Sequence, residues 1–174
     1  MNIFHLSKNP RYCAEWLCDK HCVKMIVETG QMLSTAYQRH FGLNNDLYKP
    51  AYPKHPMTIW VGNTKGNFIF TLTLFDYLLN EYNCRYQKIH STNRIKKLLW
   101  DKYTDWKKLN GEMTTPPLCM PDKYKTDCYI TSYRKYYIGE KKRIAKYKFT
   151  EPPVWLRDLI KEQRQLVKVV FDAK

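Results

Sequence analysis

Apolar residues recur at intervals of three and four along most of the chain, which is the spacing of one face of an α-helix. The clearest stripe begins after Asn9 and Pro10, which are typical of a helix N-cap and first turn. Gly42 ends the pattern, so we predict one helix from these residues to about His40. The core-facing members of the stripe are Cys22, Ile26, Thr29, Leu33, Ala36 and Tyr37.

A second helix is predicted over about 56–86, where "FIFTLTLFDYLLNEY" is apolar nearly all round, as in the centre of a bundle. "FIFTLTLF" alone would also suit a buried strand, but the length of the surrounding pattern favours a helix. Further helices are expected from near 91, over about 127–147, and after Pro152 and Pro153. The sequence therefore predicts an all-α fold, a compact single-domain bundle of about five helices over residues 1–174, with long Pro-containing loops.

The net charge of the chain indicates what kind of partner it binds. Thirty Lys and Arg residues against sixteen Asp and Glu give a net charge of +14, which favours a polyanion and above all nucleic acid. No apolar run approaches the roughly 20 residues of a membrane-spanning helix, and "MNIFHLSKNP" has no signal-peptide pattern. We therefore expect nucleic acid as the partner and no membrane.

Six cysteines lie at positions 13, 18, 22, 84, 119 and 128, without a C-x-x-C pair. This arrangement favours free thiols in a reducing compartment. A zinc site formed by Cys13, Cys18, Cys22 and His21 is the alternative, but the C-x4-C-x3-C spacing matches no standard zinc pattern. We expect no metal and no cofactor.

Polar side chains form a second row beside the first apolar stripe, in and after "WLCDKHCVKMIVE" (residues 16–28). On a helix, His21 and Glu28 point the same way within about 20° and lie roughly 10 Å apart, with Lys24 between them. Gln31 and Thr35 extend the row. Such a row suits the edge of a cleft, but periodicity alone favours a solvated flank with a Lys24–Glu28 ion pair.

A basic cluster follows at "SYRKYYIGEKKRIAKYK" (residues 132–148), with seven basic residues, one acid and four tyrosines. Arg134, Tyr137 and Lys141 share one helical face by their spacing. Basic side chains can neutralise phosphates and aromatic rings can stack on exposed bases, so the cluster favours nucleic-acid binding. The alternative is a basic solvated helix whose tyrosines pack inward.

The opening "MNIF" followed by "CDKHCVKM" resembles a group of small, mostly uncharacterised viral and phage proteins. More broadly, the chain resembles the phage-type endonuclease V family, the pyrimidine-dimer DNA glycosylases with AP-lyase activity. Three features carry the likeness: a D-x-H with a Glu seven residues later, an HP turn before a long helix, and an EK followed by a Pro-containing step to Trp. They fit Asp19-Lys20-His21 with Glu28, His55-Pro56, and Glu140-Lys141 with Trp155.

This resemblance, which is gapped but covers most of the chain, implies a small basic all-α domain that cuts the glycosidic bond with its N-terminal amine. It makes Glu28 the carboxylate that supports cleavage, with His21 beside it. Lys141 would hold backbone phosphate, with Arg134 nearby.

The chain departs from the family at its start. The family nucleophile is the amine of a small residue exposed when Met is removed, whereas Asn2 is large enough to disfavour removal of Met1. Ile3 stands where a basic residue would help, and Gln31 where the family keeps an arginine against the damaged site. Three alternatives follow. Met1 supplies the nucleophilic amine, the reaction differs from that of the family, or the protein binds nucleic acid without a catalytic activity.

Together with this resemblance, the sequence predicts a monomeric viral or phage-type DNA glycosylase/AP lyase that acts on damaged or modified double-stranded DNA through an amine and a carboxylate. The expected location is the cytoplasm, that of the host for a viral protein, or the nucleus of a eukaryotic host. The alternative is a non-catalytic viral protein that holds nucleic acid or a nucleotide in the same basic cleft. The predicted catalytic residues are Glu28, His21 and Met1, and the predicted nucleic-acid-binding residues are Lys24, Gln31, Arg134, Tyr137 and Lys141.

The charge leads to a first prediction, that duplex DNA binding weakens steeply with salt. A site that contacts about six phosphates should lose roughly a thousandfold in affinity between about 50 and 200 mM salt, because bound counterions are released from the duplex. Fluorescence anisotropy with a labelled duplex measures this slope. An affinity that stays constant over that range would contradict the prediction.

Overall fold

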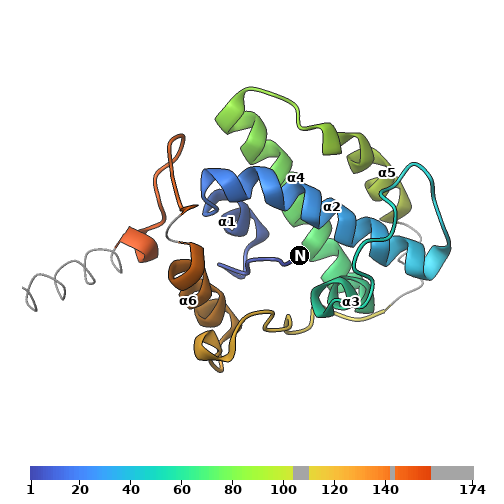
Figure 1. The fold of residues 1–174 in the computed structure, drawn as a ribbon. Helices are drawn as coiled ribbons and strands as arrows, with labels where there is room; N and C mark the ends of the chain where they lie inside the picture. Colours follow the sequence, from blue (N-terminus) through green and yellow to red (C-terminus); the bar gives the residue numbers. More distant parts are fainter. Residues whose placement is uncertain (104–109, 142–143, 158–174) are drawn as a thin grey trace, which may run out of the picture.

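The computed structural model describes residues 1–103, 110–141 and 144–157 (Figure 1). Within these ranges the chain forms helices and no strand, which confirms the predicted all-α bundle. "FIFTLTLF" lies inside a helix. The elements are α1 (Pro10–Glu15), α2 (Asp19–Phe41), α3 (Pro56–Asn63), α4 (Lys65–Tyr86), η1 (Ser91–Ile95), α5 (Lys96–Asp101), η3 (Asp122–Tyr124) and α6 (Tyr129–Lys141).

The first predicted helix is in fact two helices, because the chain breaks at residues 16–18 between α1 and α2. Arg85 of α4 reaches into this break. Its guanidinium donates hydrogen bonds to the carbonyl oxygens of Glu15 at 2.9 Å and Leu17 at 2.8 Å. Carbonyls at the end of a helix lack partners within it, so Arg85 acts as a cap from a distant helix.

The second predicted helix is also divided, at Thr64. This residue has an extended backbone, and its hydroxyl accepts a hydrogen bond from the Asn67 amide at 3.1 Å, which makes it the N-cap of α4. The Asn67 side chain donates to the Trp60 carbonyl near the end of α3 at 2.7 Å and accepts from the Thr114 amide at 2.8 Å. The junction of α3 and α4 is thereby tied to the long loop that leads to α6.

The later predicted helices differ from the structure mainly in their limits. The pattern near 91 gives the 3-10 turn η1 followed by α5. The helix predicted over 127–147 is α6, which begins at Tyr129 and whose last described residue is Lys141. The last predicted helix is helical over residues 154–157, and the rest of it lies outside the described residues.

α2 and α4 run side by side through the centre of the fold (Figure 1). α1 packs on α4, and α3 packs on both central helices. All six residues of the predicted apolar stripe on α2 are buried. Among the described helices, none combines the length and apolar character needed to cross a lipid bilayer.

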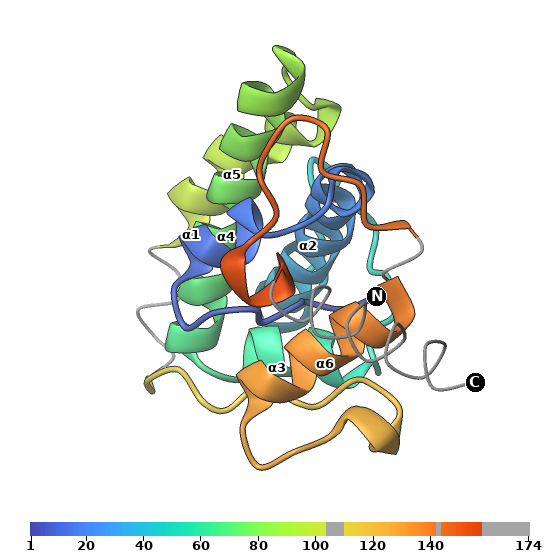
Figure 2. The same cartoon turned by 90° about the vertical axis from the view of Figure 1, so that its left-hand side faces the viewer.

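α6 joins this bundle largely through the N-terminal segment, residues 1–6, which passes between α6 and the central helices (Figures 1 and 2). The Phe4 ring lies edge-on to Tyr137, with centroids 5.1 Å apart, and the Leu6 carbonyl accepts a hydrogen bond from Nε of Arg134 at 2.9 Å. Four consecutive residues of the segment are buried: Ile3, Phe4, His5 and Leu6. The N-terminal segment is therefore part of the core.

The Arg85 cap predicts a large loss of stability when its charge is removed. The Arg85 side chain is only 1% exposed and pairs with Asp19 at 3.2 Å and Glu81 at 2.7 Å. Arg85→Met should lower the free energy of unfolding by about 3 kcal/mol or more, because it leaves these acids and the helix-end carbonyls unpaired. Urea denaturation followed by circular dichroism measures the change.

Arg94→Met is the matched control, because Arg94 makes one hydrogen bond to the Asp46 carbonyl on an exposed surface. Its effect should stay below about 1 kcal/mol. Equal losses in both variants would contradict the role assigned to Arg85.

Candidate active site

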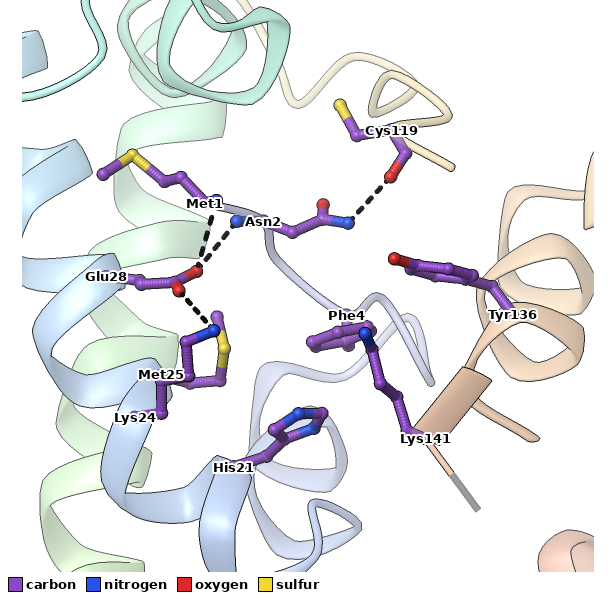
Figure 3. A pocket seen from close by; sticks show the side chains of 10 residues that line it. All are labelled: Met1, Asn2, Phe4, His21, Lys24, Met25, Glu28, Cys119, Tyr136 and Lys141. Atoms are coloured by element: carbon purple, nitrogen blue, oxygen red, sulfur yellow. Dashed lines mark hydrogen bonds and ion pairs between the residues drawn. The ribbon is translucent and has the colours of Figure 1, made fainter. Parts of the chain in front are cut away.

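A pocket of about 170 Å³ opens between the N-terminus, α2 and the C-terminal part of α6 (Figure 3). It brings together five of the residues predicted from the sequence: Met1, His21, Lys24, Glu28 and Lys141. The other residues that line it are Asn2, Phe4, Met25, Cys119 and Tyr136. Gln31, Arg134 and Tyr137 do not line it.

An amine and a carboxylate meet in this pocket. The amino-terminal nitrogen of Met1 lies 3.8 Å from Oε2 of Glu28, and the Asn2 amide donates a hydrogen bond to the same oxygen at 3.0 Å. Nζ of Lys24 lies 3.2 Å from the other carboxylate oxygen, Oε1. The Glu28 side chain is 15% exposed, so its head group reaches solvent through the pocket and not across an open helix face.

The first two residues are fixed by contacts on both sides. The Asn2 side chain donates to the Cys119 carbonyl at 2.9 Å (Figure 3). Its oxygen accepts from the Ile3 amide at 2.9 Å. The Met1 side chain is 2% exposed, and its sulfur accepts a hydrogen bond from the Thr58 hydroxyl at 3.4 Å. These contacts hold the amine beside Glu28.

His21 forms the wall of the pocket opposite the amine and is 4% exposed. Its ring stacks on Phe4 with a centroid distance of 5.0 Å, and its Nδ1 is hydrogen-bonded to the Tyr137 hydroxyl at 3.1 Å. Burial lowers the pKa of His21 to about 4, and the charges of Lys141 and Lys24 add to this effect. The imidazole is therefore neutral at pH 7.

Tyr137, the hydrogen-bond partner of His21, is buried beneath the pocket wall. The residue is 1% exposed, and its hydroxyl also accepts a hydrogen bond from the Cys18 amide at 2.9 Å. Burial raises the pKa of Tyr137 well above its usual value. A ring buried to this degree does not stack on a base in this conformation, so its placement agrees with the inward-packing alternative and not with direct binding of nucleic acid.

Arg134 and Gln31 also lie away from the pocket. The Arg134 guanidinium is placed between two indole rings, 5.3 Å from the centroid of Trp16 and 5.0 Å from that of Trp155. Burial lowers its pKa. Gln31 is half-buried on α2, one turn beyond Glu28. The face predicted for Arg134, Tyr137 and Lys141 is thus not one solvent-facing ridge, because the three side chains have different surroundings.

The end of α6 supplies Lys141 and a residue that sequence reasoning missed, Tyr136. Nζ of Lys141 lies 5.2 Å from the centroid of the Tyr136 ring. Asn2, Phe4 and Cys119 were also missed, because they come from segments without helical periodicity. The "MNIF" opening is the one sequence signal that could have pointed to Asn2 and Phe4.

All six cysteines are free thiols, and Cys13, Cys18 and Cys22 are buried. Among the described residues, no group of three or more His, Cys, Asp or Glu side chains is placed to hold a metal ion. The chemistry of the pocket is that of a primary amine next to a carboxylate, with two lysines at the rim. The amine can form a covalent imine with a carbonyl-type carbon, and the carboxylate can transfer protons to and from that imine.

Comparison with known protein families gives a match for the first part of the chain. A family model described as pyrimidine dimer DNA glycosylase matches residues 1–94. The matched part contains α1 to α4 and, in the pocket, the amine, His21, Lys24 and Glu28, whereas Cys119, Tyr136 and Lys141 lie beyond it. No match is found among curated proteins or solved structures.

The burial of His21 predicts a low pKa for its imidazole in the folded protein. We expect its ring protons to titrate with a midpoint of about 4 in the folded protein, against about 6.5 in the unfolded chain. The unfolded chain then takes up this proton first as the pH falls, so His21 should destabilise the fold progressively from pH 6.5 to pH 4. NMR of the imidazole signals measures the midpoint.

Lys141→Gln should raise this midpoint, because it removes a nearby positive charge that opposes protonation. Lys88→Gln, which changes an exposed lysine beyond the end of α4, is the control and should leave the midpoint in place. A His21 midpoint near 6.5 in the folded protein would contradict the burial of the ring.

Proposed function

The chain belongs to the pyrimidine dimer DNA glycosylase family, and we propose that it is a DNA glycosylase with AP-lyase activity on damaged or modified bases in duplex DNA. The family acts on DNA, so DNA is the partner. The observation that carries the proposal is the amino-terminal nitrogen held 3.8 Å from the Glu28 carboxylate in a pocket with Lys24 and Lys141 at its rim.

The proposed reaction begins with the neutral amine of Met1. Its nitrogen attacks C1′ of the deoxyribose, and the bond from C1′ to the base breaks with its electron pair on the base, which takes up a proton. The nitrogen loses a proton, and the sugar ring opens as O4′ accepts one, which leaves a protonated imine between Met1 and the sugar. Removal of a C2′ proton then expels the 3′ phosphate, and water hydrolyses the imine to return the amine.

Glu28 has two tasks in this sequence. Its carboxylate stabilises the positive charge that develops at C1′ and on the imine nitrogen, and it carries protons between the amine, C2′ and solvent. The hydrogen bond from the Asn2 amide and the ion pair with Lys24 fix the head group for these tasks. Lys24 and Lys141 would neutralise the phosphates on either side of the target sugar.

His21 contributes as a neutral ring. With its Nδ1 bound to Tyr137 and a pKa of about 4, it offers hydrogen bonding to the sugar without adding a charge next to the lysines. The proposal for Tyr137 is therefore a positioning role through His21, in place of direct contact with DNA.

We propose that Met1 is retained and that its amine is the nucleophile. The Met1 side chain fills a buried position and contacts Thr58, so the fold has a specific place for this residue. Loss of Met1 would leave the Asn2 nitrogen as the amine, 3.0 Å from Glu28. Mass spectrometry of the untagged protein decides which amine is present.

The function is tested by trapping the imine. The untagged protein is incubated with abasic-site and ultraviolet-irradiated duplexes under borohydride, which reduces the imine to a stable adduct, and peptide mapping locates the adduct. We expect it on Met1. A protein that binds both duplexes in a salt-dependent manner but forms no adduct would instead support the non-catalytic binding protein.

Glu28→Gln tests the carboxylate. The amide keeps the shape of the side chain but removes the charge and the proton transfer, so strand cleavage should slow by roughly a hundredfold or more. Affinity for DNA and the unfolding midpoint should change little, because the ion pair with Lys24 is worth only a few tenths of a kcal/mol.

Glu15→Gln is the matched control. Glu15 makes the same kind of i,i+4 ion pair, with Arg11 on α1, but it lies outside the pocket. Glu81 is unsuitable as a control, because it pairs with the buried Arg85. Equal cleavage rates for the wild type and Glu28→Gln would refute the role of the carboxylate.

A further inference from the structure

Tyr52 has an unusual backbone and an exposed ring. Its φ of 47° lies in the left-handed region, which bulky residues seldom adopt, and the residue is 69% exposed. Among the described residues other than glycine, Gln87 alone shares a positive φ, and it ends α4 in the usual left-handed C-cap. Tyr52 ends no helix, so its conformation needs another reason.

The neighbouring contacts hold Tyr52 in this conformation. The Ala51 amide donates to the Thr35 hydroxyl at 2.9 Å, and the Arg39 guanidinium donates to the Pro53 carbonyl. The Tyr52 carbonyl accepts a hydrogen bond from the His55 amide at 3.0 Å. The backbone on both sides of Tyr52 is thereby fixed to α2 and to the start of α3, and the ring projects into solvent. Strain that the surroundings impose in this way is concentrated at functional sites.

The turn that contains Tyr52 is attached to α2, the helix that carries Glu28 of the candidate active site. Thr35, which binds Ala51, follows Glu28 by seven residues on the same side of α2, a distance of about 10 Å along the helix. α3, which begins just after the turn, contacts Met1 through Thr58. Burial lowers the pKa of His55, and the positive charge of the amine adds to this effect. The turn that carries Tyr52 is therefore attached to the row that starts at His21, at Thr35, two helical turns beyond Glu28.

The surroundings of Tyr52 are basic. Lys49 and Lys54 are exposed on the same turn, as is Arg39 on α2. Acidic side chains are absent from residues 47–55. An exposed aromatic ring between cationic side chains is the arrangement that nucleic-acid-binding proteins use to stack on bases while they neutralise phosphates.

Removal of a base requires that its nucleotide leave the helical stack, which exposes neighbouring bases. Resting on the proposed function, we propose that Tyr52 stacks on such a base of the bound duplex. Thr35, to which the turn is attached, lies about 10 Å from Glu28 along α2. At about 3.4 Å per base along one strand, this distance corresponds to about three bases, so we expect Tyr52 to reach a base near the third from the target sugar. Tyr52 would be a binding residue that stabilises the opened DNA, and the rigid turn would present its ring at little cost in ordering.

Substitution of Tyr52 should affect the stability of the fold and the affinity for DNA in different ways. Tyr52→Asn removes the ring but tolerates the left-handed backbone, so the unfolding midpoint should stay the same or rise. Affinity for a duplex with an abasic analogue should fall by about 5- to 150-fold, the range expected for loss of one base–aromatic stack. Tyr52→Phe keeps the ring and should keep the affinity.

The experiment uses the untagged protein and duplexes that contain tetrahydrofuran, an abasic analogue that cannot form the imine. 2-Aminopurine is placed one to five bases from the analogue on each strand, and its fluorescence reports stacking. We expect a Tyr52-dependent change centred near the third base. Ile89→Asn, at another strongly exposed apolar residue (78%), is the control and should alter neither affinity nor fluorescence.

The outcomes separate this proposal from the proposed function. Unchanged affinity and fluorescence in Tyr52→Asn, with normal borohydride adducts, would overturn the stacking role and leave the enzyme function intact. Tyr52-dependent stacking without any adduct in the wild type would support the stacking role and overturn the glycosylase/lyase chemistry. A fall in affinity equal to that of Ile89→Asn would also overturn the stacking role.

Discussion

Burial of the N-terminal segment is the interaction on which the rest of the structure depends. Ile3, Phe4 and Leu6 are at most 7% exposed, and burial of side chains of this size contributes roughly 1.5–3 kcal/mol each. His5 is also fully buried, and burial lowers its pKa to about 3, so it packs as a neutral aromatic ring against Phe70. The same four residues separate the central helices from α6 and hold both. The amine is placed by this apolar core, and the weak ion pair with Glu28 only completes its position.

The charged groups divide into those that maintain the fold and those left for the pocket. Arg85 is enclosed by acids and carbonyl oxygens, and Arg134 lies between two indoles, so neither guanidinium faces the pocket. Lys24 and Lys141 stand at the rim, with Glu28 as the acid between them and the amine. A net charge of +14 does not by itself distinguish these classes, because the distinction depends on which cations find partners in the interior.

Local signals in the sequence account for much of the fold and for part of the pocket. The three-and-four spacing predicts the buried face of α2, and it places His21, Lys24 and Glu28 on one neighbouring row, where the structure has them. The breaks after α1 and α3 were not predicted, because they depend on Arg85 and on the contact of Asn67 with Thr114, which are distant in the chain.

The part of the pocket formed by distant segments could not be predicted for the same reason. Cys119 lies in a loop that reaches Asn2 only in the folded chain, at a separation of 117 residues. On α6, spacing grouped Tyr137 with Lys141 but could not tell which of the two side chains faces the interior. That choice is made by His21 and by the Cys18 amide, which use the Tyr137 hydroxyl as a partner.

The path of the N-terminal segment also bears on the order of events during synthesis. The contact between Leu6 and Arg134 joins residues 128 apart. At the usual rate of about 5–20 residues per second, the ribosome needs roughly 6–26 s to make the intervening chain. Through that interval the buried apolar residues at positions 3–6 lack the helix that covers them, although α1 to α4 are completed before α6 is made. The pocket, although built on the first residues made, is among the last parts of the molecule to be completed.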